Sequence, residues 1–145
     1  MPIFNDDGEI PLLAAYPAIQ RLVLSCIDKH RFPYTRTQFT ILSVLTRQST
    51  LYMSQIADQI NASHEQATRS VAPLADDGLV ERYVDPHNRK MVHIKLTERG
   101  AAFMSDFRVH FREALRGRLR EKLDQGEIDR LAQAAGTLAE LLEKL

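Results

Sequence analysis

The chain has 145 residues, of which 44% are hydrophobic, and its 19 basic and 19 acidic side chains give a formal net charge of zero. This length suits one domain with a hydrophobic core, and no apolar run is long enough to span a membrane. The single cysteine, Cys26, excludes an internal disulfide and a multi-thiolate metal site within the chain. The acidic N-terminus does not resemble a secretory signal, so we expect a cytoplasmic protein.

The N-terminal part predicts a loose tail followed by two helices. Residues 1–9 show no periodic pattern, whereas apolar residues recur at helical spacing over residues 10–30. We expect this helix to bend or to start afresh at Pro17, since proline resists a helix interior. A second helix is predicted after Thr35, because Thr35 and Gln38 have the spacing of a capping box.

Two short helices joined by a tight turn come next. The first is expected over residues 54–60, and residues 61–62 form the turn. Ser63 caps the second helix, Gln66 completes its capping box, and Gly78 ends it. This order is typical of a helix-turn-helix, in which the N-terminal end of the second helix enters the major groove.

The remaining elements are a hairpin and two helices. Residues 79–84 and 90–96 are predicted strands around a turn at 85–89, since apolar residues alternate in the second strand. A long helix over about residues 97–123 precedes a last helix capped by Asp124. The fold class expected is mainly α with a small β-hairpin wing (α+β), a winged helix-turn-helix core between N- and C-terminal helices.

Polar and basic side chains crowd the start of the second short helix. Gln66 suits adenine, and Arg69 suits a guanine edge or a phosphate. The free N–H groups of the first turn also favour phosphate oxygens. The alternative is an ordinary solvated helix face, with Gln66 used only for capping. The candidate DNA-binding residues here are Ser63, His64, Gln66, Thr68, Arg69 and Ser70.

The hairpin turn predicts a second DNA contact. An Arg–Lys pair at a hairpin tip suits the minor groove, where a narrow groove concentrates negative potential. Asp85 is expected to accept backbone N–H groups of the turn and to stabilise the wing. An ordinary charged hairpin is the alternative. The candidate DNA-binding residues of the hairpin are Arg82, His87, Asn88, Arg89 and Lys90.

Taken together, these pieces resemble the winged-helix core of the MarR family of bacterial transcription regulators. The matching segments are Gln38-Phe39-Thr40-Ile41-Leu42, Gln55-Ile56-Ala57, Thr68-Arg69-Ser70-Val71, Leu74, Gly78-Leu79-Val80-Glu81-Arg82, Asp85-Pro86, Arg89-Lys90 and Leu96-Thr97-Glu98-Arg99-Gly100. The resemblance implies a homodimeric repressor that binds double-stranded DNA at a pseudo-palindromic operator. It also implies release by a small aromatic ligand or an oxidant.

The resemblance divides the chain into an N-terminal tail and dimerisation helix (1–34), a DNA-binding lobe (35–100) and C-terminal dimerisation helices (101–145), within one structural domain. The candidate dimerisation residues are Ile19, Val23, Leu119, Leu131, Leu138 and Leu142. The candidate effector residues are Tyr16, Cys26, His30, Tyr34 and Phe107.

Two of the effector candidates have simpler alternatives. Cys26 is expected in the first helix, where Lys29 and His30 would follow it by one turn and lower its pKa; a small buried core residue is the alternative. The phenylalanine ladder that includes Phe107 is expected to pack in the core or the dimer interface, with an aromatic ligand cage as the alternative.

This chain departs from the family pattern at three places. Pro73 is expected to bend the second short helix. The wing has Asn88-Arg89-Lys90 where the family often has Asp-Arg-Arg, and Tyr52 occupies a usual capping position, so the cap is expected at Ser54.

Two other classes of function are alternatives to a DNA-binding regulator. Zero net charge and Pro73 favour a winged-helix protein-interaction module that does not bind DNA. No Ser/His/Asp arrangement, phosphate loop or metal-ligand spacing predicts an enzyme, a cofactor or a metal site.

Overall fold

The computed structural model describes residues 11–145, so the predicted tail over residues 1–9 lies outside the described residues. The chain divides into two compact units, which we describe separately. Of the described residues, one unit contains residues 11–28 together with His110–Leu145, and the other is Lys29–Val109. No helix over residues 11–145 combines the length and the apolar character needed to cross a membrane.

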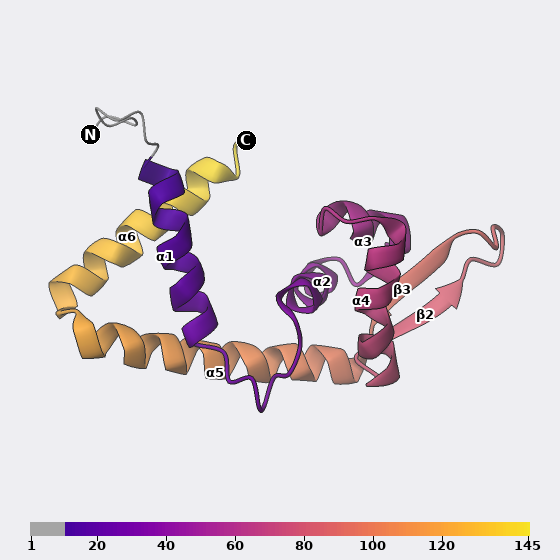
Figure 1. Cartoon of the computed structure of the whole chain (residues 1–145), viewed down its shortest axis with the longest axis horizontal. Helices are drawn as coiled ribbons and strands as arrows, with labels where there is room; N and C mark the ends of the chain where they lie inside the picture. Colours follow the sequence, from indigo (N-terminus) through magenta and orange to yellow (C-terminus); the bar gives the residue numbers. More distant parts are fainter. Residues whose placement is uncertain (1–10) are drawn as a thin grey trace. The chain divides into compact units, whose positions relative to one another are not determined.

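The unit Lys29–Val109 contains three helices, three strands and the start of a fourth helix (Figure 1). In chain order these elements are α2 (Arg36–Arg47), β1 (Thr50–Tyr52), α3 (Met53–Gln59), α4 (His64–Asp76), β2 (Val80–Val84), β3 (Val92–Leu96) and the first part of α5 (Glu98–Lys122). The predicted fold class, mainly α with a small β-hairpin wing, is confirmed.

Capping boxes fix the starts of α2 and α4 as predicted. In α2 the Gln38 N–H donates to Thr35 Oγ1 at 3.2 Å, and the Thr35 N–H donates to Gln38 Oε1 at 2.8 Å. Ser63 and Gln66 make the same reciprocal pair at the start of α4. Each box satisfies two backbone donors that a helix leaves without an internal partner.

The sequence reasoning missed β1 and misplaced the cap of α3. Thr50 begins a strand that pairs antiparallel with β3. The N-cap of α3 is Tyr52 and not Ser54. Its own side chain makes no capping hydrogen bond, but Gln55 Oε1 accepts the Tyr52 N–H at 2.8 Å. A glutamine at the third helical position thus replaces the small capping residue that we expected.

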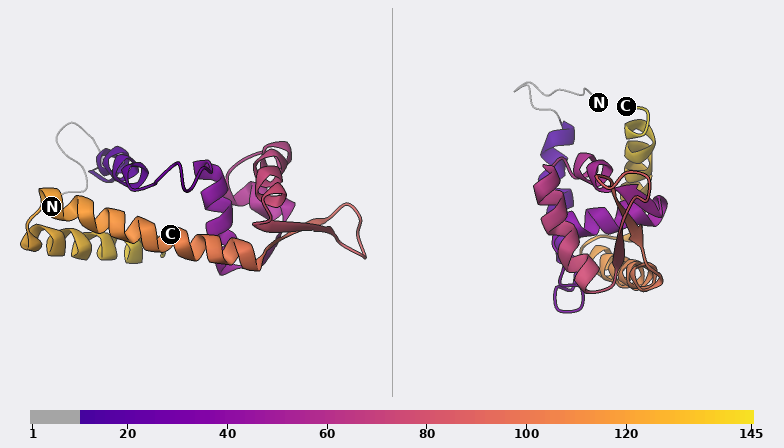
Figure 2. Two further views of the ribbon diagram at one scale, coloured as in Figure 1. Left: turned by 90° about the horizontal axis from the view of Figure 1, so that it is seen from below. Right: turned by 90° about the vertical axis from the view of Figure 1, so that its right-hand side faces the viewer.

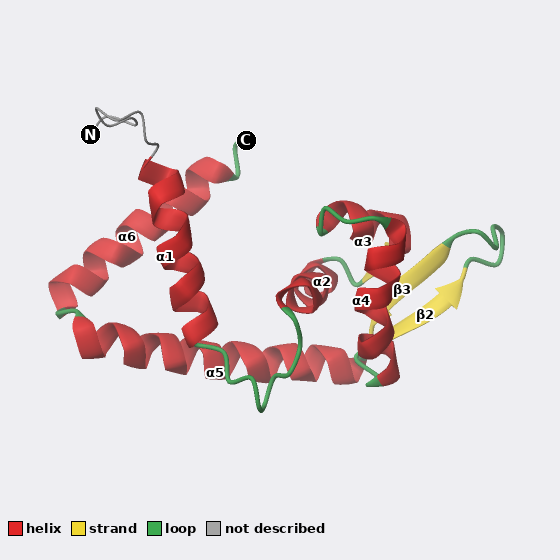
Figure 3. Ribbon diagram, in the orientation of Figure 1, coloured by secondary structure: helices red, strands yellow, loops and turns green. Residues whose placement is uncertain are grey.

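The sheet has the strand order β1-β3-β2, and all neighbouring strands are antiparallel. Its inner face covers the helices through Ile94, which is completely buried together with Leu42, Leu45 and Leu74. Figures 2 and 3 show that the β2–β3 hairpin continues past the helices of this unit and ends in a projecting loop. The hydrophobic core therefore holds the base of the wing and leaves its tip exposed.

A tight joint connects the end of α4, the wing and α5. Gly78 follows α4 with a φ of 74°, in the left-handed region that favours glycine. Thr97 Oγ1 lies 2.6 Å from the Gly78 carbonyl oxygen and 3.0 Å from that of Leu79, and it accepts the Gly100 N–H at 3.0 Å. A Cβ atom on Gly100 would lie 2.0 Å from the Leu79 carbonyl oxygen. Only glycine lets α5 approach this closely.

The other unit contains α1 (Pro11–Ser25), α6 (Gln125–Leu142) and the remainder of α5. α1 continues through Pro17. A proline inside a helix removes one backbone hydrogen bond, and α1 tolerates this loss. In the same way α4 continues through Pro73 to Asp76. The predicted capping box of Asp124 and Glu127 begins α6.

Candidate nucleic-acid interface

The helix-turn-helix consists of α3, a short turn and α4. Asn61 occupies the turn with a φ of 49°, a left-handed conformation that asparagine tolerates better than most residues. The Ala62 N–H donates to the Ala57 carbonyl at 2.9 Å, which closes the turn over the end of α3. The first turn of α4 is therefore held at the surface, where His64, Glu65 and Gln66 are all exposed.

Two of the predicted base-reading side chains already have partners within α4. Gln66 Oε1 accepts the Ser63 N–H at 3.1 Å, and the Arg69 guanidinium forms an ion pair with Glu65. The Arg69 side chain is nevertheless 71% exposed. Bidentate recognition of adenine needs both the oxygen and the NH₂ group of a glutamine. Gln66 must therefore release its cap to read a base in that way, whereas Arg69 only has to change partner.

Two further candidates on α4, Thr68 and Ser70, are half-buried. The Thr68 hydroxyl donates to the His64 carbonyl at 2.9 Å, so its proton is used within the helix. The Ser70 carbonyl accepts the Gln38 Nε2–H at 3.2 Å, which ties α4 to α2. Exposed contact chemistry on this helix is thus concentrated in its first two turns.

The wing tip is fixed by its own polar groups. Asp85 Oδ1 accepts the N–H groups of His87 at 2.8 Å and Asn88 at 3.1 Å, which are the backbone hydrogen bonds expected of this residue. Asn88 Oδ1 accepts the Lys90 N–H at 3.2 Å. The Asp85 N–H donates to the Met91 carbonyl at 2.9 Å and closes the hairpin. The missing family carboxylate at position 88 is thus replaced by an amide oxygen.

Sequence reasoning missed a partner of Asp85. His93 Nε2 lies 2.8 Å from Asp85 Oδ2, and the His93 ring lies against two tyrosine rings. The pKa of Asp85 is lowered, chiefly by the His93 hydrogen bond and next by the His87 N–H. The alternation that predicted β3 puts His93 on the outer sheet face, so this contact could have been anticipated.

Three basic side chains of the wing face solvent. Arg82 lies on β2, whereas Arg89 and Lys90 lie at the tip, and all three are exposed. Over residues 11–145, no hydrogen bond or ion pair engages the Arg89 or Lys90 side chain. A rigid turn that presents uncommitted cations suits a phosphate-lined groove.

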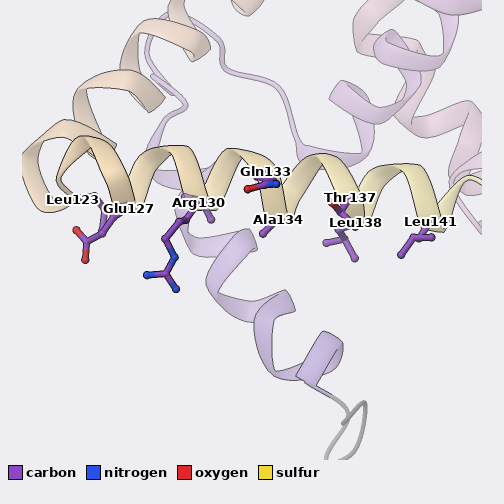
Figure 4. Close-up of a pocket in the computed structure, with 9 residues that line it drawn as sticks. Leu123, Glu127, Arg130, Gln133, Ala134, Thr137, Leu138 and Leu141 are labelled. Carbon is purple, nitrogen blue, oxygen red and sulfur yellow. The ribbon is translucent and has the colours of Figure 1, made fainter. Parts of the chain in front are cut away.

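The predicted dimerisation residues lie on exposed or half-buried helix faces. Ile19 is 46% exposed, Val23 39%, Leu131 43% and Leu142 45%, while Leu119 and Leu138 are half-buried. Neither α1 nor α6 contains a buried residue. A groove of about 910 Å³ follows α6, lined by leucines together with Glu127 and Arg130 (Figure 4). Large apolar side chains are thus left uncovered in a single chain.

The candidate effector residues fall in both units. Tyr16 and Cys26 belong to the unit of α1, whereas His30, Tyr34 and Phe107 belong to the other. The Cys26 side chain is buried, but α1 ends at Ser25. Its expected position inside the first helix is wrong, and Lys29 and His30 do not follow it by one helical turn.

The aromatic candidates pack within their own unit. Phe107 stacks on Phe39 at 4.5 Å between ring centroids and meets Phe32 edge-on at 5.2 Å. The Tyr34 hydroxyl donates to Asp77 Oδ2 at 2.6 Å, at the C-cap of α4. Burial, followed by this hydrogen bond, raises the pKa of Tyr34 to about 12. These contacts are those of core packing.

Comparisons with known proteins agree with this geometry. Residues 34–92 match the model of the MarR family. The chain is 28% identical over 112 residues to YhbI of Bacillus subtilis (strain 168), an uncharacterized HTH-type transcriptional regulator. The matched region covers 77% of this chain and 72% of YhbI.

Solved structures share the fold. Wild-type MarR (apo form) from E. coli superposes with a TM-score of 0.73 at 20% identity, over 88% of this chain and 92% of MarR. YusO from Bacillus subtilis superposes with a TM-score of 0.69 at 19% identity, over 89% of this chain and 92% of YusO. Residues 34–92 therefore match the MarR family, as the sequence motifs predicted, and the chain shares the fold of these solved structures.

Proposed function

We propose that the chain acts as a homodimeric repressor in which the first turns of α4 enter the major groove and the wing tip enters the minor groove. The observation that carries the proposal is the pair of exposed surfaces in one unit: the capped start of α4 and the rigid tip with Arg89 and Lys90. Helix and hairpin contacts of this kind fix a protein on adjacent grooves of one duplex. The candidate residues listed above then divide into base-reading and phosphate-contacting groups.

Arg89 tests the wing assignment directly. Arg89→Ala should weaken binding to a duplex selected by the protein from a random-sequence pool by on the order of tenfold. It should also reduce the slope of log affinity against log salt by about one, since one contact to the phosphates or the groove is lost. The thermal midpoint should stay unchanged, because no hydrogen bond or ion pair over residues 11–145 engages the exposed side chain.

Arg47→Ala is the matched control, since it removes an equal charge from the exposed C-terminal end of α2. Equal losses in the two variants would show a general charge effect and would contradict the wing assignment. Wild-type affinity that barely responds to salt would favour the alternative, a protein-interaction module without DNA binding.

The homodimer is proposed from the uncovered faces of α1 and α6. Exposed leucines along α6 continue into a groove, and a second copy of the chain would bury them. A twofold dimer presents two copies of α4 and so matches a pseudo-palindromic operator. Leu131→Glu should lower the sedimentation mass toward that of one chain, whereas Ala132→Glu, which adds the same charge outside the groove, should not.

Release by a small aromatic ligand or an oxidant stays a prediction from the family resemblance. Thermal shift against a panel of phenolic compounds tests the ligand, and intact mass after mild peroxide tests oxidation of Cys26. The buried position of the thiol favours the simpler core role for this residue. An unchanged mass of the peptide that contains Cys26, under peroxide that oxidises the thiol of a control peptide, would exclude Cys26 as the sensor.

A further inference from the structure

A histidine lies between two tyrosines in one row across the sheet. Tyr52 on β1, His93 on β3 and Tyr83 on β2 are direct register partners. The His93 ring is parallel to the Tyr83 ring, with 2° between the planes and 4.6 Å between centroids, and lies 4.3 Å from the Tyr52 ring. Only 15% of the His93 side chain is exposed, although this is the outer face of the sheet.

The same histidine is connected to the wing tip through one carboxylate. His93 Nε2 lies within hydrogen-bond distance of Asp85 Oδ2, at 2.8 Å, while Asp85 Oδ1 accepts the His87 and Asn88 N–H groups. The carboxylate therefore bridges the ring on β3 and the backbone of the tip. Tyr52 is also the N-cap of α3, so the row continues into the first helix of the helix-turn-helix.

We infer that His93 is a positioning residue of the wing: held between Tyr52 and Tyr83, it fixes Asp85 and the tip to the sheet. The hydrogen bond between the ring and Asp85 is charge-assisted, because one partner is a carboxylate, and the two tyrosine rings restrict the ring that makes it. Only the consequence for DNA affinity rests on the proposed function.

The other charges near the ring nearly cancel. Lys95 is the next residue on the same face of β3, and Glu81 on β2 is its register partner. Both are exposed, whereas Asp85 is in direct contact with the ring. The Asp85 carboxylate is therefore the charged group that the ring engages directly.

The first readout does not involve DNA. Solvent exchange of the backbone amides of His87 and Asn88 is measured by NMR at one pH and divided by the intrinsic rate of each amide. His93→Phe keeps an aromatic ring between the tyrosines but cannot form the hydrogen bond with Asp85. We expect exchange at both positions to be about threefold faster in this variant than in the wild type.

A second substitution separates the hydrogen bond from the stack. His93→Gln keeps an N–H donor near the position of Nε2 and loses the ring, so exchange at positions 87 and 88 should return toward the wild-type rate. Far-ultraviolet circular dichroism checks the fold of each variant, and amides within α2 supply an internal reference that neither substitution should change.

The second readout is affinity for the selected duplex. His93→Phe should bind this duplex about threefold more weakly than the wild type, whereas His93→Gln should bind nearly as tightly as the wild type. Amide exchange that is the same in all three proteins would overturn the role of His93, whatever the affinities. Exchange that follows the expectation without a difference in affinity would leave the clamp standing and refute the wing contact with DNA.

Discussion

Replacing Gly100 by alanine tests the joint between the wing and α5. The new Cβ would lie 2.0 Å from the Leu79 carbonyl oxygen and 2.7 Å from Leu96 Cδ1. An ordinary carbon–oxygen contact is about 3.3 Å, so α5 must retreat by on the order of 1 Å. That movement also breaks the hydrogen bonds of Thr97 to the Gly78 and Leu79 carbonyls.

Overpacking of this kind costs about 1–3 kcal/mol, and each lost hydrogen bond costs about 1 kcal/mol. Alanine regains at most about 1 kcal/mol of helix propensity. We therefore expect Gly100→Ala to lower the free energy of unfolding by about 3 kcal/mol. Urea denaturation followed by circular dichroism, at one fixed protein concentration, measures this quantity.

Gly117 supplies the control within the same helix. A Cβ atom there would meet nothing within 4 Å, so Gly117→Ala should raise the free energy of unfolding by about 1 kcal/mol. The reasoning fails if Gly100→Ala is as stable as the wild type while Gly117→Ala behaves as expected. It also fails if the two substitutions change stability equally.

Two further predictions concern single side chains. Tyr34→Phe should lower the free energy of unfolding by about 1 kcal/mol, because the hydrogen bond to Asp77 is lost. Since the pKa of Tyr34 is raised to about 12, the free energy of unfolding of the wild type should also fall from about pH 10 upward, and this fall should be smaller in the variant. An identical alkaline profile would contradict the assignment. Gln66→Glu keeps an acceptor for the Ser63 N–H, so its free energy of unfolding should stay unchanged, whereas Gln66→Ala should lower it by about 1 kcal/mol. Equal urea midpoints for the two variants would show that the cap contributes nothing to stability.

Local signals in the sequence were enough to predict most helices and the hairpin. The spacing of Thr35 with Gln38, of Ser63 with Gln66 and of Asp124 with Glu127 fixed three helix starts, because a capping box depends only on neighbouring residues. β1 was missed because a strand of three residues carries almost no periodic pattern, and its pairing with β3 depends on distant residues.

The candidate site was predictable to a similar degree. The wing and the start of α4 follow from contiguous motifs, so their residues could be named. The roles of Tyr52, Tyr83 and His93 follow from strand register, which links positions far apart in the chain. The effector candidates were the least predictable, since the end of α1 at Ser25 removed the neighbours expected around Cys26.

Gln38 fixes the position of α4 relative to α2. It is the one buried polar residue over residues 11–145, and its oxygen closes the cap of α2 while its nitrogen holds the Ser70 carbonyl. Leucine and valine contacts allow two helices to slide by small steps at little cost, but a directional bond in an apolar surrounding does not. A leucine at position 38 would preserve the volume of the side chain but lose the hydrogen bond to the Ser70 carbonyl. The position of α4 relative to α2 would then be less well defined. In the DNA complex proposed above, the choice of a DNA site would then depend on an amide that lies between α2 and α4.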